Sequence, residues 1–247
     1  MQMLLQEDVS LPRVSGLLET DAALATEVLR AANSPLLWLG TEVKRIPAAV
    51  TKLGLNRLGL LVATTALWRM IPGSVKNGFV RAWWRHNLAC ALVCRELADA
   101  GCASEYGYIA GLLHSVGQLA FIGMYPVEYS ALLARAAAAG RTVRDCEREW
   151  MGADHCELGS ALLRKWGIPE EIAACAAHHH DPENSASPLA ELACAACLVA
   201  NRLGFASGPG YELPDWRLPQ VAEDFLADEA LCASTADSVR WLESSLQ

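Results

Sequence analysis

The 247-residue sequence has no uninterrupted apolar run of 18 residues and no excess of basic charge. Its longest apolar stretches, 110–124 and 189–200, are broken by polar residues, which argues against a membrane span. The net charge is −8 at pH 7, so the chain lacks the positive surface that binds phosphate backbones. The first residues carry Glu7 and Asp8 and no basic region, which is not typical of a secretory signal. We therefore expect a cytoplasmic protein with neither nucleic acid nor membrane as a partner.

The sequence also lacks β-branched runs with a two-residue alternation, so strands are not predicted. Apolar residues recur instead at spacings of three and four, which predicts an all-α fold. The hydrophobic fraction of 53% provides enough apolar material for a sizeable core. A helix is predicted between Asp21 and Asn33, and others at 48–53, 57–70, 80–100, 126–139, 156–166, 169–179, 188–203, 221–227 and 234–246.

Composition divides the chain into three parts. Pro-Gly-Ser at 72–74 breaks the helical pattern, which predicts a first helical subdomain over residues 1–75. A second helical block follows over residues 76–206, and we expect the two to pack together. The stretch 207–210 is typical of a linker, and residues 207–247 form an acidic tail with two short helical patterns. We expect this tail to cap a subdomain or bind a partner.

Nine cysteines are present, and most lie among alanines and leucines in helical patterns. They are predicted to be small buried hydrophobes in a reducing compartment. Cys90 and Cys94 are one helical turn apart, which fits one buried helix face. Cys194 and Cys197 have the CxxC spacing, but a zinc ribbon needs a second such pair and a thioredoxin-like site needs a βαβ setting. Neither is present, so this spacing alone indicates no site.

Histidines recur at His86, His114, His155 and the run 178–180, and only a folded helical core can bring such distant positions together. Each alone is more simply a core or surface residue. His114 lies in an apolar stretch, where a buried imidazole needs a hydrogen-bond partner or a metal. The three consecutive histidines cannot all face one site, because successive helical side chains are about 100° apart. Gathered around one cleft, the histidines would form a metal site.

Four ordered motifs run through the chain: ETDAALATEVLRAANSPLL at 19–37, RIPAAVTKLGLNRLGLLV at 45–62, GLLHSVGQL at 111–119 and ADHCELGSALLRKWGIPEEIAACAAHHH at 153–180. Together they resemble the HDOD family, the HD-related output domain of bacterial signalling proteins. This family is a degenerate branch of the HD superfamily of metal-dependent phosphohydrolases. The resemblance covers roughly residues 4–204 and implies two packed helical subdomains, the second an HD-like helical core.

The sequence departs from the active HD enzymes at two positions. In those enzymes an aspartate that follows a histidine is a central metal ligand, and a second aspartate lies late in the domain. The resemblance implies that Ser115 and Asn201 hold these places here. Both side chains are neutral, and a hydroxyl is a poor ligand for a hard dication. Holding two metals and activating a bound water both become harder.

Other motif residues are predicted to determine the fold. Asn33 and Ser34 are expected to end a helix and to bridge the two subdomains through hydrogen bonds. Gly54 and Gly117 are expected to end a helix or to permit close helix approach. Four tryptophans are predicted to anchor the core or the subdomain interface: Trp83, Trp84, Trp150 and Trp166.

Two hypotheses about function follow. Under the first, the chain is a non-catalytic signal-transduction output or scaffold domain without a cofactor, acting through signalling proteins or a ligand in the cleft. Under the second, it is a metal-dependent phosphohydrolase or phosphodiesterase with a mononuclear site for Zn, Fe or Ni, and Asp154 or Glu157 activates water. The candidate ligands are His86, His114, His155, His178, His179 and Asn201. The two missing acids favour the first hypothesis, and the sequence indicates no particular oligomeric state.

A third hypothesis, DNA binding by the first helical block, is disfavoured. Its short helices are similar in arrangement to a helix-turn-helix. The acidic balance and the lack of a basic recognition helix argue against that role.

Overall fold

The computed structural model describes residues 10–33, 42–70, 78–102, 106–185, 187–208 and 216–245. Every regular element in these ranges is helical, so the predicted all-α fold class is confirmed. The chain divides into two compact units, Met1–Met70 with Trp241–Gln247, and Ile71–Arg240. The predicted boundary at 72–75 lies outside the described residues. Of the predicted C-terminal tail, the residues up to Arg240 belong to the second unit and those from Trp241 to the first.

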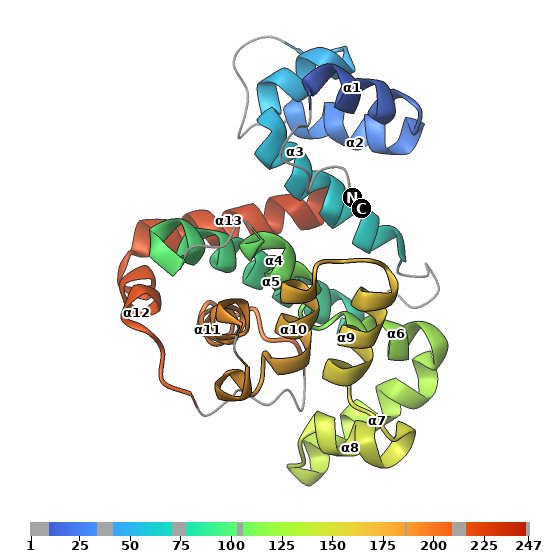
Figure 1. The fold of residues 1–247 in the computed structure, drawn as a ribbon, viewed down its shortest axis with the longest axis vertical. Helices are drawn as coiled ribbons and strands as arrows, with labels where there is room; N and C mark the ends of the chain where they lie inside the picture. Colours follow the sequence, from blue (N-terminus) through green and yellow to red (C-terminus); the bar gives the residue numbers. More distant parts are fainter. Residues whose placement is uncertain are drawn as a thin grey trace. The chain divides into compact units, whose positions relative to one another are not determined.

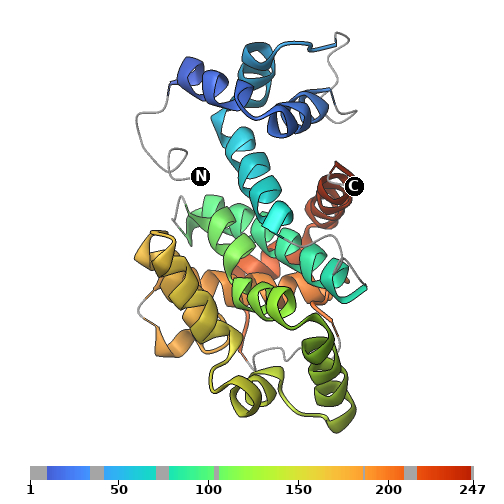
Figure 2. The ribbon, with the colours of Figure 1, turned by 90° about the vertical axis from the view of Figure 1, so that its right-hand side faces the viewer.

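The first unit is built mainly from three helices, α1 (Leu11–Glu19), α2 (Ala22–Ala32) and α3 (Ile46–Met70). Both α1 and α2 pack against α3 (Figure 2). The sequence pattern did not single out α1. The core of this unit takes side chains from all three helices, and Trp241 packs against it; its fully buried members include Val28, Ala32, Ala49, Val50 and Leu58.

Polar side chains fix both ends of α2. Asp21 accepts hydrogen bonds from backbone N–H groups in the first turn of α2 and forms an ion pair with Arg69 of α3. Asn33 ends α2 and pairs with the backbone of Val43 in both directions, at 2.8 Å from Nδ2 and 2.7 Å to Oδ1. This bridge lies within the first unit, so the predicted bridge between subdomains is wrong for Asn33. Ser34 lies outside the described residues.

α3 is interrupted at Gly54, whose backbone (φ 74°, ψ 163°) is not helical. The sequence predicted the end of one helix at this residue and the start of another soon after it. That prediction is confirmed, although the two segments follow each other without a loop.

The second unit holds the remaining helices. In chain order they are α4 (Gly78–Leu97), the π-helical η4 (Ala98–Cys102), α5 (Gly107–Leu113), α6 (Val116–Met124), α7 (Pro126–Ala139), α8 (Val143–Met151), α9 (His155–Lys165), α10 (Glu170–His178), the 3₁₀-helical η5 (Pro182–Asn184), α11 (Pro188–Arg202), α12 (Gln220–Ala227) and α13 (Glu229–Ser245). The last residues of α13, from Trp241, belong to the first unit. The helix predicted over 80–100 ends at Leu97 as an α-helix and widens into η4.

α4 is the central helix of this unit, and it packs against α5 and α11 (Figure 1). The helices that meet here carry small buried residues, which lets helix axes approach closely: Ala89, Cys90, Ala91 and Cys94 on α4, and Ala190, Ala193, Cys194, Cys197 and Ala200 on α11. Most cysteines are therefore small buried residues, as predicted, while Cys146 and Cys232 are half-buried. All the cysteines whose side chains the structure describes are free thiols.

Two glycines permit direct backbone contact between helices. A Cβ at Gly111 would lie 2.6 Å from the carbonyl oxygen of Cys90, and a Cβ at Gly117 would lie 2.0 Å from that of His155. No side chain fits at such distances, so α5 rests on the backbone of α4, and α6 rests on the start of α9. The close approach predicted for Gly117 is confirmed.

The tryptophans divide between core and surface. Trp83 and Trp84 are buried, as predicted. Trp150 is half-buried and lies against the rings of Phe121 and Tyr129. Trp166 is 37% exposed at the end of α9, so of its two predicted places, core or subdomain interface, the core is excluded.

One apolar segment, Gly107–Met124, is long enough to cross a membrane by length and composition. It is 78% buried inside the structure, as the core helices of a folded domain are. A turn at His114 and Ser115 also divides it into α5 and α6.

Replacing Gly117 tests the contact between α6 and α9. Gly117→Ala forces the His155 carbonyl and α6 apart, so we expect the free energy of unfolding to fall by about 3 kcal/mol. Gly123→Ala on the same helix is the control, because nothing lies within 4 Å of its Cβ position. This control should change stability by less than about 1 kcal/mol. Equal effects of the two substitutions in urea denaturation would contradict the contact.

Candidate functional site

Five of the six histidines converge in the interior of the second unit. They come from four segments: His86 from α4, His114 from the end of α5, His155 from the start of α9, and His179 and His180 from the turn after α10. Neighbouring ring centroids lie between 4.2 and 5.6 Å apart. His180 is 9% exposed and the other four are 1% or less. The imidazoles thus form one continuous buried histidine row.

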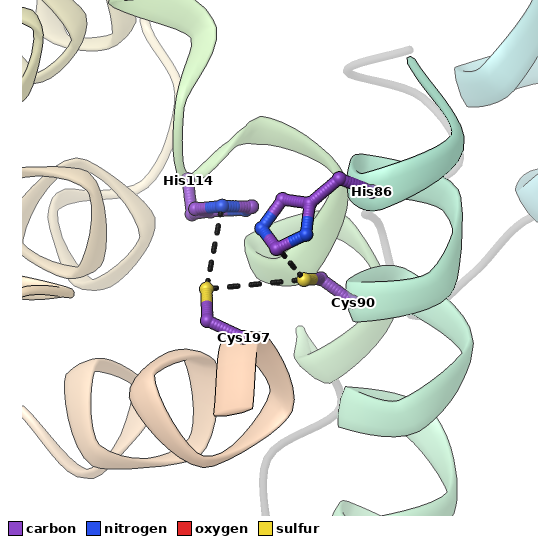
Figure 3. Close-up of side chains that lie close together, drawn as sticks. All are labelled: His86, Cys90, His114 and Cys197. Carbon is purple, nitrogen blue, oxygen red and sulfur yellow. Dashed lines mark hydrogen bonds between the residues drawn. The ribbon is translucent and has the colours of Figure 1, made fainter. Parts of the chain in front are cut away.

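One end of the histidine row is joined by two cysteines. His86, Cys90, His114 and Cys197 have ligand atoms that all lie within 4.8 Å of one another; we call this set the two-cysteine cluster. Figure 3 shows that α4 supplies two of these side chains, the turn after α5 one and α11 one. The contacts run from His86 Nε2 to Cys90 Sγ at 3.4 Å, on to Cys197 Sγ at 3.8 Å, and on to His114 Nε2 at 3.5 Å. The chain therefore gathers two imidazoles and two sulfurs around one point.

The other end of the histidine row holds a second set, His155, Cys156, His179 and His180, whose ligand atoms also lie within 4.8 Å of one another. We call it the one-cysteine cluster. Nε2 of His155 lies 3.2 Å from Nε2 of His180. The Cys156 sulfur lies 3.9 Å from Nδ1 of His179. The two clusters adjoin through the rings of His114 and His179, whose centroids are 4.8 Å apart.

Acceptors around the histidine row fix the tautomers. The Nδ1 atoms of His86, His114 and His179 lie 2.7–2.9 Å from the backbone carbonyl oxygens of Phe205, Gly111 and Ala176. A carbonyl oxygen only accepts, so each Nδ1 donates, and the Nε2 of a neutral ring keeps its lone pair. Outer acceptors that orient histidines in this way are typical of metal-binding sites.

Nε2 of His179 is buried and has no hydrogen-bond partner among the described residues. A buried polar atom of this kind indicates a bound species that completes the site.

Glu147 of α8 is a buried acid behind the histidine row, with no exposed surface. It accepts hydrogen bonds from the backbone N–H of His155 at 2.8 Å, from His155 Nδ1 at 2.7 Å and from the Tyr129 hydroxyl. These three bonds satisfy a charge that would be costly to bury alone. The carboxylate also orients the His155 ring.

Burial and neighbouring charges set the protonation states. Burial lowers the pKa of both His179 and His180 well below the ordinary range, and nearby imidazoles add to the effect. Burial also acts to lower the pKa of His155. The neighbouring Cys156 and Glu147 outweigh burial and raise this pKa well above the ordinary range. A charged His155 can therefore donate from Nε2 to neutral His180.

The two central thiols differ as well. Burial raises the pKa of Cys90, whereas the hydrogen bond from Cys90 and the proximity of His114 lower the pKa of Cys197 against the effect of burial. Cys197 is thus the acceptor of the pair and the stronger candidate metal ligand, because the thiolate is the ligating form.

Comparison with known protein families identifies the family to which the chain belongs. The sequence profile of the HDOD domain matches residues 1–182, about three quarters of the chain. The chain belongs to the HDOD family. Its fold is also that of a solved HDOD domain protein from Geobacter sulfurreducens, with a TM-score of 0.76 and 24% identity over 99% of this chain and 88% of that one.

Other relatives carry different names. A protein from Shewanella amazonensis, proposed to be a phosphohydrolase, has a TM-score of 0.72 and 25% identity over 96% of this chain and 90% of that one. An uncharacterized protein of Treponema pallidum is 23% identical over 94% of this chain and 45% of its own length. Ribonuclease Y of Thermus thermophilus is 37% identical over 105 residues, 41% of this chain and 18% of the enzyme. The chain spans less than half the length of these curated relatives.

The structure brings together four of the six predicted ligand residues of this HDOD chain: His86, His114, His155 and His179. His178 is half-buried and lines an open surface pocket of about 560 Å³, so the triplet residue that joins His179 in the interior is His180. Asn201 is half-buried near the end of α11, and it is Cys197, one turn earlier, that meets the histidines. Neither His178 nor Asn201 belongs to the two-cysteine cluster or the one-cysteine cluster.

The two predicted water-activating acids are engaged in helix capping. Asp154 caps α9, accepts from the backbone N–H groups of Cys156 and Glu157, and pairs with Arg144 and Arg148. Burial acts to raise the pKa of Asp154, but the hydrogen bonds from the Glu157 N–H and from Arg144 outweigh it and lower the pKa. Glu157 closes the capping box by accepting from the Asp154 N–H at 3.0 Å. Their carboxylates serve the fold, which argues against the predicted role as a base.

The resemblance to HD enzymes gives Ser115 the place of their aspartate. Its hydroxyl belongs to a closed network of hydrogen bonds. Its Oγ accepts from Trp83 Nε1 and donates to Asn87 Oδ1, both at 2.9 Å. Asn87 in turn donates to the Trp83 carbonyl at 2.8 Å. The hydroxyl is fully buried and its donor is used within this network. Ser115 therefore holds the turn between α5 and α6 to α4, and it belongs to neither cluster.

Sequence reasoning missed five members of the site: Cys90, Cys156, Cys197, His180 and Glu147. The cysteines were predicted to be buried hydrophobes because their neighbours are alanines and leucines. The spacing did offer an indication, since Cys90 lies one turn after His86 and Cys156 directly follows His155.

The donor atoms of each cluster are suited to binding a metal ion. HD enzymes use histidines and aspartates, whereas the clusters here offer imidazole and sulfur. Such donors suit zinc and other borderline or soft ions, and they do not suit Mg²⁺ or Ca²⁺. The residues present thus fit a metal of a different class from the one that carboxylate-rich sites prefer.

The contacts of Glu147 predict a large effect of its removal. Glu147→Ala leaves His155 without its carboxylate partner, so we expect the free energy of unfolding to fall by about 3–5 kcal/mol. Glu149→Ala on the same helix is the control, because Glu149 is exposed and pairs only with exposed Arg141. Its unfolding midpoint in urea should stay close to that of the unmodified protein. A small loss in both variants would contradict the role given to Glu147.

Proposed function

We propose that this HDOD chain is a non-catalytic signal-transduction domain of the bacterial cytoplasm that acts through protein partners or a bound ligand. The observation that carries the proposal is the closed state of the histidine row. An HD hydrolase needs a metal with an open coordination position that substrate and water can reach. Here every histidine of the row is buried, with an exposed fraction of at most 9%.

The electrostatics of the histidine row support the same proposal. Ser115 brings no charge, and its hydroxyl is held by Trp83 and Asn87. Asp154 is neutralised by two arginines at the cap of α9. No carboxylate of the described residues belongs to either cluster, so a bound water would lack both a bridging ligand and a base. Of Zn, Fe and Ni, the mixed imidazole and thiol donors favour zinc.

Family membership supports a signalling role. HDOD domains resemble the output modules of signalling proteins, and the net charge of −8 favours protein partners over nucleic acid. One similar fold belongs to a protein of Marinobacter aquaeolei that is proposed to act in signal transduction, with a TM-score of 0.74 and 21% identity over 99% of this chain and 55% of that one. At that identity the likeness concerns the fold.

The second candidate function is metal-dependent phosphohydrolysis at a single histidine-rich site. The partial match to ribonuclease Y and the likeness to the Shewanella protein favour it. The orphaned Nε2 of His179 also favours a bound species within the histidine row. The burial of every histidine of the row argues against a substrate reaching that species.

A turnover assay separates the two candidates. The purified full chain is incubated with a cyclic dinucleotide, a nucleoside triphosphate and an RNA oligonucleotide, each with Zn²⁺, Mn²⁺, Fe²⁺ or Ni²⁺. We expect product formation no faster than that of the His114→Ala variant, because the histidine row admits no substrate. His178→Ala is the control, since this side chain faces the surface. Turnover that persists in His178→Ala and disappears in His114→Ala would overturn the proposal.

A further inference from the structure

The two-cysteine cluster has the composition of a structural zinc site. Its four donors are two cysteine sulfurs and two imidazole nitrogens, the Cys₂His₂ set that commonly holds zinc in folded proteins. We propose that His86, Cys90, His114 and Cys197 bind one zinc ion with four protein ligands and no open position. This inference goes beyond the proposed function, because it assigns a structural metal to a chain whose family relation suggests a catalytic one.

Three of the six separations between ligand atoms of the cluster are close to those of a zinc tetrahedron. With zinc–sulfur and zinc–nitrogen bonds of about 2.3 and 2.0–2.1 Å, a regular tetrahedron has sulfur–sulfur edges of about 3.8 Å and sulfur–nitrogen edges of about 3.5 Å. The corresponding separations are 3.8 Å between Cys90 and Cys197, 3.4 Å between Cys90 and His86, and 3.5 Å between Cys197 and His114. The other pairs of ligand atoms lie within 4.8 Å of each other, so all four ligands surround one point.

Both histidines present the correct nitrogen. The carbonyl oxygens of Phe205 and Gly111 receive the Nδ1 protons of His86 and His114 at 2.8 and 2.7 Å. Nε2 of each ring then carries the lone pair and faces a cysteine sulfur. Fixing the tautomer before the metal arrives removes an ordering cost of binding.

The two sulfurs also balance the charge. Ser115 and Asn201 bring no negative charge to the positions that carry acids in HD enzymes. Two thiolates at Cys90 and Cys197 neutralise Zn²⁺ within the cluster, so the buried ion carries no net charge with its ligands. Where HD enzymes carry hard carboxylate ligands, this chain therefore offers soft thiolates, on the packed helices α4 and α11.

Four protein ligands leave no place for a catalytic water. Zinc with three protein ligands and water is the usual catalytic arrangement, whereas a closed set of four is structural. The ion would tie together α4, the turn after α5, and α11. Through His86 and Phe205 it would also hold the segment that follows α11.

The one-cysteine cluster is a weaker candidate for the same ion. Nε2 of His155 is already bonded to Nε2 of His180, and Nδ1 of His155 is bonded to Glu147. The cluster offers a single sulfur, whose distance to His179 is 3.9 Å, and this contact involves the nitrogen that already donates to Ala176. Hydrogen bonds within the protein therefore already engage most of the ligand atoms of the one-cysteine cluster.

Elemental mass spectrometry of the untagged full chain tests the proposal. We expect about one zinc per chain, reduced to near zero in Cys197→Ala because one of the four ligands is lost. Two controls replace other buried thiols: Cys194→Ala, one turn earlier on α11, and Cys156→Ala in the one-cysteine cluster. Both should keep about one zinc.

A spectroscopic measurement on the unmodified chain guards against a variant that fails to fold. Replacement of zinc by Co²⁺ should give the intense visible absorption and the thiolate-to-cobalt charge transfer of a tetrahedral sulfur-containing site. No metal after reconstitution with zinc under reducing conditions would overturn the proposal. So would zinc that is lost in Cys156→Ala and kept in Cys197→Ala. Turnover of a phosphodiester would overturn only the proposed function.

Discussion

The direct contact of helix backbones around α4 is the constraint on which the rest of the second unit depends. Gly111 rests on the Cys90 carbonyl, and small side chains separate α4 from α11. This packing buries the imidazoles, so every buried nitrogen needs a partner. The backbone carbonyls and Glu147 supply most of these partners. The histidine row is therefore ordered by its surroundings, and its remaining lone pairs point to one another and to the cysteines.

Under the function that we propose, the same packing separates this HDOD chain from an HD hydrolase. Loss of two acids alone would leave a weakened but open metal site. Here Ser115 is drawn into a network with Trp83 and Asn87, and cysteines stand on the inner faces of α4 and α11. The result is a closed centre with neutral net charge when zinc is bound. Such a centre would stabilise the positions of the helices that supply its ligands.

Much of the fold could be predicted from the sequence, because it depends on local patterns. Capping by Asp21 and Asp154, the break at Gly54 and the helix from Pro126 to Ala139 all follow from residues close in the chain. The convergence of the histidines was also expected, since a helical core can gather distant positions. The exposure of Trp166 could not be predicted, because the sequence does not show which side chains the neighbouring helices cover.

The composition of the clusters could not be predicted in the same way. Cys90 and Cys197 are 107 positions apart, and an alanine-rich helix gives no sign of which thiol faces an imidazole. The choice among the three consecutive histidines depends on the exact end of α10, after which His179 and His180 turn inward. Glu147 was missed because the sequence does not show that its side chain meets the ring of His155 on the next helix.

X-ray absorption at the zinc edge of the purified chain tests the central claim most directly, because it reports the ligand shell of the ion itself. A closed centre predicts two sulfur ligands at about 2.3 Å and two nitrogen ligands at about 2.0–2.1 Å. A shell with only nitrogen and oxygen neighbours, or one with a water in place of a sulfur, would contradict the account and return the HDOD chain to the class of open, hydrolytic HD sites.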